Sequence, residues 1–587
     1  MIGKEEFDIL RTLAERESGR KDASGKVVPP EEYRAAVERL REKGFVTGEA
    51  LSPAGLQALE PYRVRNAIIL AAGLSSRFMP LSLETPKGLL RLKGERLIER
   101  QIKQLHEAGI TDITVVVGYR QEQFFFLEKK YGVSIVINPF YASRNNISSV
   151  ALVTDRIDNT YICSSDHYFT GNIFRSHMYR STYPATWVQG STTDYSYVAD
   201  GDRRIISYKT ESTHEYGLVG PAYLDASFAA FLVEAIKKIY ADSSSWNLLW
   251  EDAFFPHLAQ CAIYVEEYPD GIIHEFDTLQ EICSFDASFL DTVDSKIMSN
   301  ICQVLNCTLS DISQIEPLKI GLTNKSFTFI AHDTKYVYRH PGEGTGVLIS
   351  RRSEAKANSA GCELGLDSTL VHIDENQGWK ISRYIYDYNY IDPYDMREVA
   401  ICMQMVKKLH EKAPPYDSEF NFIQKTEICR NILTQGLGYN FSQFEETHEK
   451  MKTLADGMDL DGRCKVQCHN DTWAWNFLRS PSGEISLIDW EYAGGAYAAC
   501  DVADFTVSLD VTISKYLEIA ELYEGKPLSD REKRHYLAAM AIVGWFWFVW
   551  GVWKEACGDT VEELLVWYEK ATEAAQLAYP LYQAEGE

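Results

Sequence analysis

The pattern of apolar and polar positions divides the chain into stretches of different kinds. Between residues 66 and 285, short continuous apolar runs such as Ala67–Ala72 and Asp112–Gly118 alternate with amphipathic segments such as Glu95–Gly109. Continuous apolar strands separated by helices predict a mostly parallel sheet that is covered on both faces. Further along, a strand-rich stretch gives way at about Arg351 to a helical period. We therefore expect a second body in which a strand-rich lobe precedes a helical lobe.

Residues 1–62 are expected to form a small unit of their own. A helix near residues 5–15 is followed by a polar loop, and Pro30 opens a second helix that stops at Gly44. A short hairpin-like stretch and another helix follow, an order that resembles a winged helix-turn-helix. Lys plus Arg and Asp plus Glu each number 12 over residues 1–65, whereas DNA-binding helices usually carry a basic surplus. A packing or interaction role is therefore favoured over DNA binding.

These patterns predict the fold class and the order of the domains. The chain is expected to be an α/β multidomain protein, because 587 residues exceed what one hydrophobic core organises. The predicted domains are a winged-helix-like unit over residues 1–62, a Rossmann-like domain with a mostly parallel sheet over residues 63–290, and a two-lobed domain over residues 291–587.

Composition and charge narrow the expected partners. The formal net charge is −25, and a field of that sign repels nucleic acid and anionic membrane, so neither is an expected partner. Any nucleotide site must therefore supply its own cations through Lys, Arg, backbone N–H groups or Mg²⁺. The 12 cysteines include no CxxC pair, and the first residues, MIGKEEFDIL, show no signal-peptide pattern. These features predict reduced thiols and a cytoplasmic protein.

One apolar stretch meets the crude length criterion for a membrane-spanning helix. Tyr536–Trp553 reads YLAAMAIVGWFWFVWGVW and contains no charged residue. Its tryptophans run through the second half of the stretch, whereas tryptophans of membrane helices gather at the interfaces. We therefore expect a buried helix that lines an aromatic pocket.

A loop rich in small residues directly follows the first strand of the parallel sheet. The strand Ala67–Leu70 continues into AAGLSSRFMPLSLETPKGLL, which contains Arg77 and Lys87. Such a loop leaves backbone N–H groups free to hold phosphate, and the two cations add local positive charge. The pattern A-A-G-x-x-S-R-x-x-P with a later P-K differs from GxGxxG, which argues against a dinucleotide-binding oxidoreductase.

From residue 66 to 285 these motifs resemble the nucleotidyltransferase superfamily, and specifically the bacterial phosphocholine cytidylyltransferases. The resemblance implies that Lys87 bridges CTP and the incoming phosphocholine. It also implies that Asp166 in YICSSDHYF and Asp277 in IHEFDTLQE hold Mg²⁺, with Glu275 beside Asp277. Because the attacking phosphate is already ionised, the expected task is charge neutralisation without a general base. The implied nucleotide contacts are Leu70, Ala71, Ala72, Gly73, Arg77 and Lys87, of which Arg77 and Lys87 are also the catalytic cations.

The choline part of the substrate requires aromatic faces and a carboxylate, because a quaternary ammonium binds through cation–π and charge interactions. By approximate alignment, the candidates for this contact are Tyr195, Tyr197, Trp250, Glu251 and Asp252.

A second motif lies far along the chain. HNDTWAWN places Asp471 two residues after His469 and Asn476 five residues after Asp471, and LIDWEY places Asp489 thirteen residues after Asn476. This spacing is typical of kinase catalytic loops, in which one aspartate serves the hydroxyl nucleophile while an asparagine and a second aspartate hold Mg²⁺. The two-lobed domain is therefore expected to be protein-kinase-like.

From about Pro317 onward the chain resembles the choline/ethanolamine kinase family. The resemblance implies that GLTNKSF (321–327), with Asn324, is the nucleotide loop, and that Arg339 pairs with Glu354 beside ATP. It further implies that Asp471 orients the choline hydroxyl or accepts its proton, while Asn476 and Asp489 hold Mg²⁺. Asp504 in DVADF is expected to support the fold.

The same resemblance implies a function for the apolar segment Tyr536–Trp553. A W-G-x-W stretch lines the choline pocket in that family, and here it is Trp550-Gly551-Val552-Trp553. Positions three apart share one helix face, so both rings can contact one trimethylammonium group. Tyr497 is a third candidate wall.

Together these sites predict a bifunctional enzyme that makes phosphocholine from choline and ATP and then CDP-choline and pyrophosphate from phosphocholine and CTP. Two alternatives stay open at this stage. The first is the same chemistry on ethanolamine or another amino alcohol, and the second is a winged-helix DNA-binding regulator that senses choline metabolites. The oligomeric state is not predicted.

Overall fold

The structure is a computed structural model that describes residues 2–17, 30–192, 195–318, 324–342 and 345–583. The chain divides into two compact units, Met1–Ser299 and Asn300–Glu587. The first unit contains the expected small N-terminal region and the α/β sheet, and the second contains the strand-rich and helical lobes. The predicted limits of the three domains stay predictions.

The N-terminal region consists of three helices and one hairpin. Its elements are α1 (Lys4–Glu17), α2 (Pro30–Glu42), β1 (Val46–Thr47), β2 (Ala50–Leu51) and α3 (Pro53–Leu59). The helices pack around Phe7, Leu10 and Leu40, which are almost completely buried. The winged-helix assignment remains a prediction, and part of the loop before α2 lies outside the described residues.

A ten-stranded sheet forms the centre of the first unit, in the order β13-β12-β15-β10-β16-β8-β3-β6-β7 with β17 beside β10. Strands β8, β3, β6 and β7 are parallel to one another, and β17 is parallel to β10. The pairings from β8 through β16, β10, β15 and β12 to β13 are antiparallel. The Rossmann-like, mostly parallel sheet is thus confirmed. The strands of this unit are β3 (Asn66–Ala71), β4 (Arg91–Leu92), β5 (Glu95–Arg96), β6 (Ile113–Val117), β7 (Ser134–Ile137), β8 (Thr160–Ser164), β9 (His167–Phe169), β10 (Thr182–Trp187), β11 (Ser191–Thr192), β12 (Ser196–Ala199), β13 (Ile205–Lys209), β14 (Ser212–Thr213), β15 (Tyr216–Leu218), β16 (Ala222–Leu224), β17 (Tyr264–Glu267) and β18 (Ile273–Glu275).

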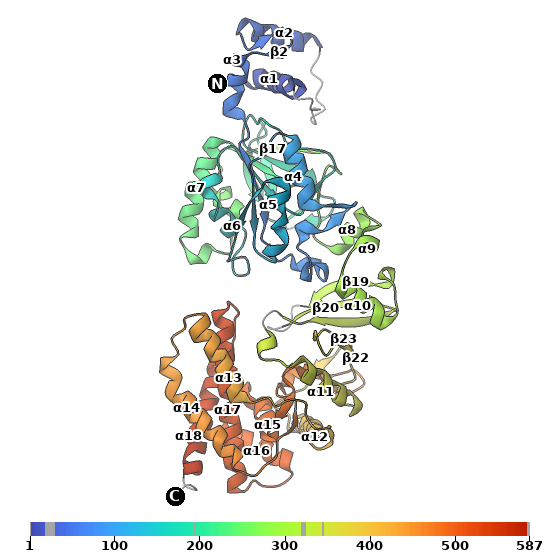
Figure 1. Cartoon of the computed structure of the whole chain (residues 1–587), viewed down its shortest axis with the longest axis vertical. Coiled ribbons are helices and arrows are strands. Elements are labelled where there is room, and N and C mark those ends of the chain that lie inside the picture. The colour runs from blue at the N-terminus through green and yellow to red at the C-terminus, as the bar shows by residue number, and fades with distance from the viewer. Residues whose placement is uncertain (1, 18–29, 193–194, 319–323, 343–344, 584–587) are drawn as a thin grey trace. The chain divides into compact units, whose positions relative to one another are not determined.

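Helices cover both faces of the sheet because successive strand residues point to opposite sides. Ala67 and Ile69 of β3 pack with α4, whereas Ile68 packs with α7. Figure 1 shows these helices on either side of the strands. The helices of this unit are α4 (Leu97–Glu107), α5 (Phe126–Tyr131), α6 (Ile147–Ala151), α7 (Ala226–Tyr240), α8 (Leu279–Phe285) and α9 (Phe289–Thr292), and α10 (Lys296–Leu305) contains the division between the units.

The second unit has the expected order of a five-stranded antiparallel sheet, β19-β20-β21-β23-β22, followed by a helical lobe. Its strands are β19 (Ser313–Leu318), β20 (Lys325–Ala331), β21 (Thr334–His340), β22 (Leu370–Ile373), β23 (Lys380–Arg383), β24 (Asn389–Tyr390), β25 (Val466–Cys468), β26 (Phe477–Arg479), β27 (Ile485–Leu487) and β28 (Gly494–Ala496). Its helices are α11 (Arg351–Glu363), α12 (Met396–Lys412), α13 (Phe422–Asn431), α14 (Glu445–Asp459), α15 (Ala498–Val507), α16 (Ile513–Glu524), α17 (Asp530–Ala556) and α18 (Leu564–Gln583). The two-lobed prediction is confirmed.

Helix α17 is the central helix of the second lobe. It begins at a capping box in which Ser529 and Glu532 satisfy each other's backbone N–H groups. By length and composition it could cross a membrane, but 94% of its apolar window is buried inside the unit. It packs against α13, α14, α15 and α18, in agreement with the predicted buried helix.

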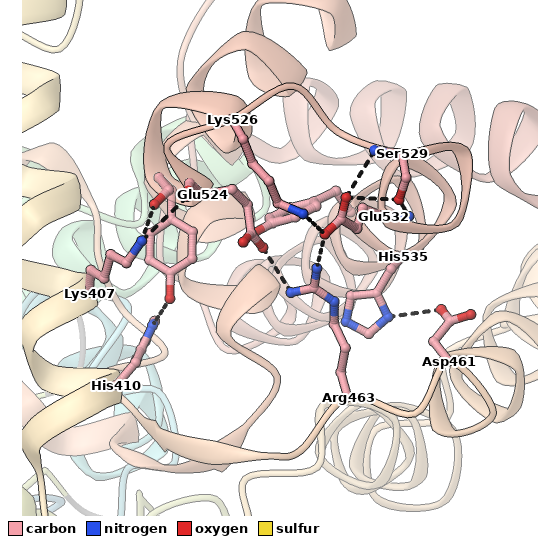
Figure 2. A network of polar contacts seen from close by, with 11 residues as sticks. Lys407, His410, Asp461, Arg463, Glu524, Lys526, Ser529, Glu532 and His535 are labelled. Atoms are coloured by element: carbon pink, nitrogen blue, oxygen red, sulfur yellow. Dashed lines mark hydrogen bonds and ion pairs between the residues drawn. The ribbon is translucent and has the colours of Figure 1, made fainter.

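A polar network fixes the start of α17 to its neighbours (Figure 2). Asp461, just after α14, accepts hydrogen bonds from Arg534 at 2.7 and 3.0 Å and from His535 at 2.9 Å, and it also accepts one from Tyr582 of α18. Close by, Arg463 bridges Glu524 and Glu532. Burial opposes ionisation of Asp461, but its three donors lower the pKa of this carboxyl to about 2.

The first prediction concerns the stability that this carboxylate provides. A carboxyl whose pKa falls from about 4 to about 2 on folding stabilises the native state by about 2 kcal/mol above the higher value, and loses this as pH falls toward 2. We expect Asp461→Asn to lower the midpoint of urea unfolding at pH 7, and the deficit to shrink below pH 4. Tryptophan fluorescence measures the transition, and Asp456→Asn, at an exposed position of α14, is the matched control. A deficit independent of pH would contradict the electrostatic explanation.

Candidate active sites

A cavity of about 510 Å³ lies beyond the carboxyl ends of the parallel strands of the first unit. The loop after β3 forms one wall, from Leu70 to Ser75, and the turn at Pro86–Gly88 forms another. In open α/β sheets, ligands bind at this edge, where loops from neighbouring strands meet. The predicted contacts Leu70, Ala71, Ala72, Gly73 and Lys87 all line this cavity, together with the metal candidate Asp166.

A buried ion pair joins two of the predicted catalytic residues. The Nζ of Lys87 lies 2.9 Å from Oδ2 of Asp166, and both side chains are largely buried. Burial opposes the charge of Lys87, but the carboxylate of Asp166 holds the pKa of the ammonium above its usual value. Burial likewise opposes the charge of Asp166, but Lys87 and His167 hold its pKa below the usual range. Both groups are therefore ionised at neutral pH.

The metal candidates gather around Asp166, with one difference from the sequence prediction. Asp166, His167 and Glu275 each present a potential ligand atom, and these atoms lie within 4.8 Å of one another. Asp277 instead forms an ion pair with Arg77 at 3.1 Å, while remaining close enough to raise the pKa of Lys87. The second oxygen of Asp166 is buried and has no hydrogen-bond partner. An unpaired buried carboxylate oxygen beside further carboxylates suits a hard divalent cation such as Mg²⁺.

His167 is a site residue that sequence reasoning missed. Burial opposes its charged form, but the hydrogen bond and charge of Glu275 raise the pKa of the imidazole. In the sequence, His167 stands directly after Asp166, but that position does not indicate that its partner is Glu275. Glu275 comes from β18, which pairs with β9 and so carries its carboxylate to His167.

The predicted contacts to the choline group form a cluster of their own. Tyr195 donates to Asp252 at 2.8 Å, and Tyr183 donates to Glu251 at 3.0 Å. Burial raises the pKa of Glu251 to about 7, and one of its oxygens has no hydrogen-bond partner. Trp250 is buried against Tyr183. Within the described part of the chain, the 510 Å³ cavity is lined by none of the five predicted residues, Tyr195, Tyr197, Trp250, Glu251 and Asp252. Tyr197 is hydrogen-bonded to Glu267 instead.

The second site lies between the two lobes of the second unit and brings the motif residues together. The side-chain amide of Asn476 donates to the backbone oxygen of Asp471 at 2.8 Å. Asp489 has the left-handed φ of +65° and lies 3.7 Å from Arg339. Arg339 also pairs with the fully buried Glu354, as predicted. Asp489 is close enough to Asp471 to raise its pKa, and carboxylate and amide oxygens are ligands that suit Mg²⁺.

Asp471 is buried among like charges. Burial, together with the charges of Asp504, Asp489 and Glu491, raises its pKa well above the usual range. Strongly perturbed carboxyl groups of this kind cluster at functional sites. Asp504 accepts hydrogen bonds from the backbone of Thr472 and from the indole of Trp547, which agrees with the supporting role expected for it.

Two further residues position the catalytic loop and were not predicted. Asp501 of α15 accepts hydrogen bonds from the backbone N–H groups of His469 at 2.8 Å and Asn470 at 2.7 Å. His410 of α12 contacts the same carboxylate at 2.9 Å. Burial opposes ionisation of Asp501, but these partners hold its pKa below the usual value. The buried carboxylate of Asp501, held by His410, thus fixes the backbone of the loop.

The predicted nucleotide loop of the small lobe is described only in part, because residues 319–323 lie outside the described ranges. Asn324 donates to Glu491 at 2.8 Å. Burial raises the pKa of Glu491 to about 7, and no motif in the sequence marked it as a site residue. Because Glu491 lies two residues after Asp489, it contacts Asn324 of the strand-rich lobe.

The tryptophans of α17 lie in different surroundings, and their predicted contact with choline stays a prediction. Trp547 lies at the centre of an aromatic cluster, with ring centroids 5.3 Å from Trp550, 5.4 Å from Trp473 and 5.5 Å from Tyr492. Trp550 is buried in this cluster. Among the described residues, Trp553 makes no comparable ring contact. Tyr497 lies outside this aromatic cluster: its hydroxyl donates to Asp459 at 2.6 Å, and its side chain lines a separate cavity of about 60 Å³. The cluster reaches Asp504 through Trp547.

Comparisons with known proteins match both units. Residues 67–261 match the MobA-like NTP transferase domain, and residues 315–541 match choline/ethanolamine kinase. The choline-phosphate cytidylyltransferase of Streptococcus pneumoniae (strain ATCC BAA-255 / R6) is 37% identical over 215 residues, which are 37% of this chain and 94% of that protein. The 2-aminoethylphosphonate cytidylyltransferase of Lancefieldella rimae is 34% identical over 229 residues, or 38% of this chain and 93% of that one.

The second unit also has a similar solved structure, the choline kinase LicA from Streptococcus pneumoniae. It is 22% identical, the match covers 48% of this chain and all of that one, and the TM-score is 0.41. The first unit gives the firmer family assignment, because its match spans nearly the full length of its relatives. The chain therefore belongs to the choline-phosphate cytidylyltransferase family of nucleotidyltransferases, and it carries a choline/ethanolamine kinase domain in the same polypeptide.

Proposed function

We propose that this protein phosphorylates choline with ATP in its second unit and transfers CMP from CTP to phosphocholine in its first, giving CDP-choline and pyrophosphate. The observation that carries the proposal is the presence, on one chain, of the Lys87–Asp166 pair beside a nucleotide-sized cavity and of a separate Asp471, Asn476 and Asp489 set. The product of the second set is the substrate of the first. We further propose that both reactions use Mg²⁺ and take place in the cytoplasm.

In the transferase reaction, an oxygen of the phosphocholine phosphate attacks the α-phosphorus of CTP, and the bond to the pyrophosphate breaks. Both reactants are anions, so the residues must offset charge repulsion. Lys87 is fixed by Asp166, and Arg77 is an exposed cation held by Asp277. Asp166 and Glu275, with Asp277 nearby, would hold Mg²⁺, which supplies further neutralisation of the phosphates. The chain itself needs no general base.

In the kinase reaction, the choline hydroxyl oxygen attacks the γ-phosphorus of ATP, and the bond to ADP breaks. Asp471 orients this hydroxyl and receives its proton, as the aspartate of kinase catalytic loops does. Burial and the neighbouring carboxylates raise the pKa of Asp471, and bound cations would favour the ionised form that accepts the proton. Asn476 and Asp489 would hold Mg²⁺ on the phosphates. Arg339 is held by Glu354 and reaches toward Asp489.

The aromatic cluster supports the choice of choline over ethanolamine as the substrate. A trimethylammonium group binds best against aromatic faces, whereas a primary ammonium prefers hydrogen-bonding acceptors. Trp473, Trp547 and Trp550 lie near Asp504 and the catalytic loop. Ethanolamine is the second candidate, because the matching family includes kinases of both alcohols and because Asp504 lies within the cluster.

Product identification tests the proposal. We expect the purified protein, incubated with equal choline and ethanolamine, ATP, CTP and Mg²⁺, to release CDP-choline in excess, as measured by mass spectrometry. CDP-ethanolamine in excess would favour the second candidate. Phosphocholine that accumulates without any CDP-choline would refute the transferase half, and the absence of both would refute the whole proposal.

A further inference from the structure

A second large cavity lies inside the first unit, away from the proposed catalytic cavity. Its volume is about 880 Å³, and it is lined by α1, by Ala36 of α2, and by the segments around β10 and β17. Ligand pockets for small molecules commonly measure about 300–1,000 Å³. Among the described residues, the two cavities share no lining residue.

The second cavity lies toward the opposite edge of the sheet. Thr182 begins β10 and Tyr264 begins β17, and both residues line it. These strands run in the same direction as β3, because β10 and β8 each pair antiparallel with β16 while β8 is parallel to β3. The cavity therefore reaches the amino ends of strands whose carboxyl-end edge holds the catalytic cavity. A ligand in one cavity does not occupy the other.

The N-terminal helices that close the cavity are packed firmly onto the sheet domain. Phe7 of α1 lies 5.0 Å from Tyr62 and 5.4 Å from Tyr179, measured between ring centroids, and Tyr62 stacks on Tyr179. Two backbone hydrogen bonds, from Val64 to Ser176 and from Met178 to Tyr62, continue this contact. The wall formed by α1 is thus held in place by buried aromatic packing.

Most charges around the cavity are neutralised by close partners. Arg175 makes two hydrogen bonds with Glu266, at 2.6 and 3.0 Å, and Arg180 pairs with Asp202 at 2.9 Å. Arg203 pairs with Glu267.

Arg11 is different. The residue is 8% exposed, its ion pairs with Asp8 and Glu15 are 3.8 and 3.9 Å long, and its Nε is buried without a hydrogen-bond partner. A buried, weakly paired guanidinium favours an anionic ligand, because a phosphate offers the two oxygens that its planar donors match.

The remaining walls are apolar or aromatic. Ile173, Met178 and Val265 line the cavity together with the rings of Tyr179 and Tyr264. Arg180 already covers one face of Tyr264, with its guanidinium 3.4 Å from the ring centroid. A ligand with an anionic group beside Arg11 and a planar, less polar body would match both kinds of wall.

We propose that this cavity is a second nucleotide-binding site of the first unit, with the phosphate of the nucleotide beside Arg11 and its base against the apolar and aromatic wall. The choice of a nucleotide as ligand rests on the proposed function, which supplies CTP, ATP and CDP-choline as anions with an aromatic base. The cavity and its weakly paired arginine do not depend on that function.

A cysteine placed in the cavity tests the proposal without relying on catalysis. Thr12 is half-buried in α1 and lines the cavity. In the full chain with Thr12→Cys, we expect CTP, ATP or CDP-choline at about ten times its dissociation constant to slow labelling of this cysteine by N-ethylmaleimide about tenfold, by simple occupancy. Peptide mass spectrometry separates this label from those on native cysteines. Glu42→Cys, at the exposed end of α2, should label at an unchanged rate.

Further measurements decide whether a nucleotide beside Arg11 causes the protection. Arg11→Gln in the Thr12→Cys background should abolish protection, and Arg11→Lys, which keeps the charge, should retain part of it. Protection must persist with Lys87→Met, which impairs the catalytic cavity. Absent protection, protection that Arg11→Gln leaves intact, protection lost with Lys87→Met, or equal protection by inorganic phosphate alone would each overturn the proposal. CDP-choline formation, measured on Thr12→Cys itself, shows separately whether the proposed function holds.

Discussion

Asp471→Asn is expected to lower kcat for choline phosphorylation by about a hundredfold to ten-thousandfold, the range that a positioned acid–base group contributes. The variant keeps the shape of the side chain but removes the carboxylate that orients the hydroxyl and takes its proton. It also relieves the like charges that raise the pKa of Asp471, so we expect the fold to be at least as stable. The measurement is phosphocholine formation from choline and ATP.

The same variant carries its own internal control. When phosphocholine and CTP are supplied directly, CDP-choline should form at the wild-type rate, because the transferase residues lie in the other unit. Glu484→Asn, at an exposed turn between β26 and β27, is a matched control on the surface of the same lobe. Near-normal kinase activity of Asp471→Asn would show that the hydroxyl is activated by another group.

The features that were correctly predicted depend on residues close together in the sequence. Continuous apolar runs such as Ile113–Val117 became buried parallel strands, and the uncharged run Tyr536–Trp553, with tryptophans along its second half, became a buried helix. The spacing of Asp471 and Asn476 likewise placed both residues on one loop, where they are hydrogen-bonded. Each of these features depends on neighbours a few residues away, so the chain encodes it locally.

Contacts between distant segments could not be read in this way. Glu275 reaches His167 only because β18 pairs with β9, and His410 reaches Asp501 across 91 positions. The aromatic cluster has Trp547, rather than Trp553, at its centre because the face of α17 that meets Trp473 is chosen by packing of the whole lobe. Helical spacing alone groups residues by face but leaves open which face meets the substrate.

Lys87→Met should reduce cytidylyltransferase activity about a hundredfold to a thousandfold, the cost of removing one fixed group that stabilises charge in a transition state. The ammonium of Lys87 is held 2.9 Å from Asp166, so it is positioned before substrate binds. Its loss leaves the incoming phosphate and the CTP phosphates to repel each other. Pyrophosphate release from phosphocholine and CTP measures the effect, and choline phosphorylation should be unchanged.

The variant also tests the electrostatic reading of the pair. Without Lys87, the buried carboxyl of Asp166 loses the partner that holds its pKa below the usual range, so its pKa should rise and its affinity for a divalent cation should become dependent on pH near neutrality. Lys87→Arg, which restores a cation, should recover part of the activity and remove that pH dependence. Lys129→Met, on the exposed surface of α5, should behave as wild type. Full activity of Lys87→Met would mean that Arg77 alone offsets the repulsion between the two phosphates, and the buried pair would then serve the fold rather than the reaction.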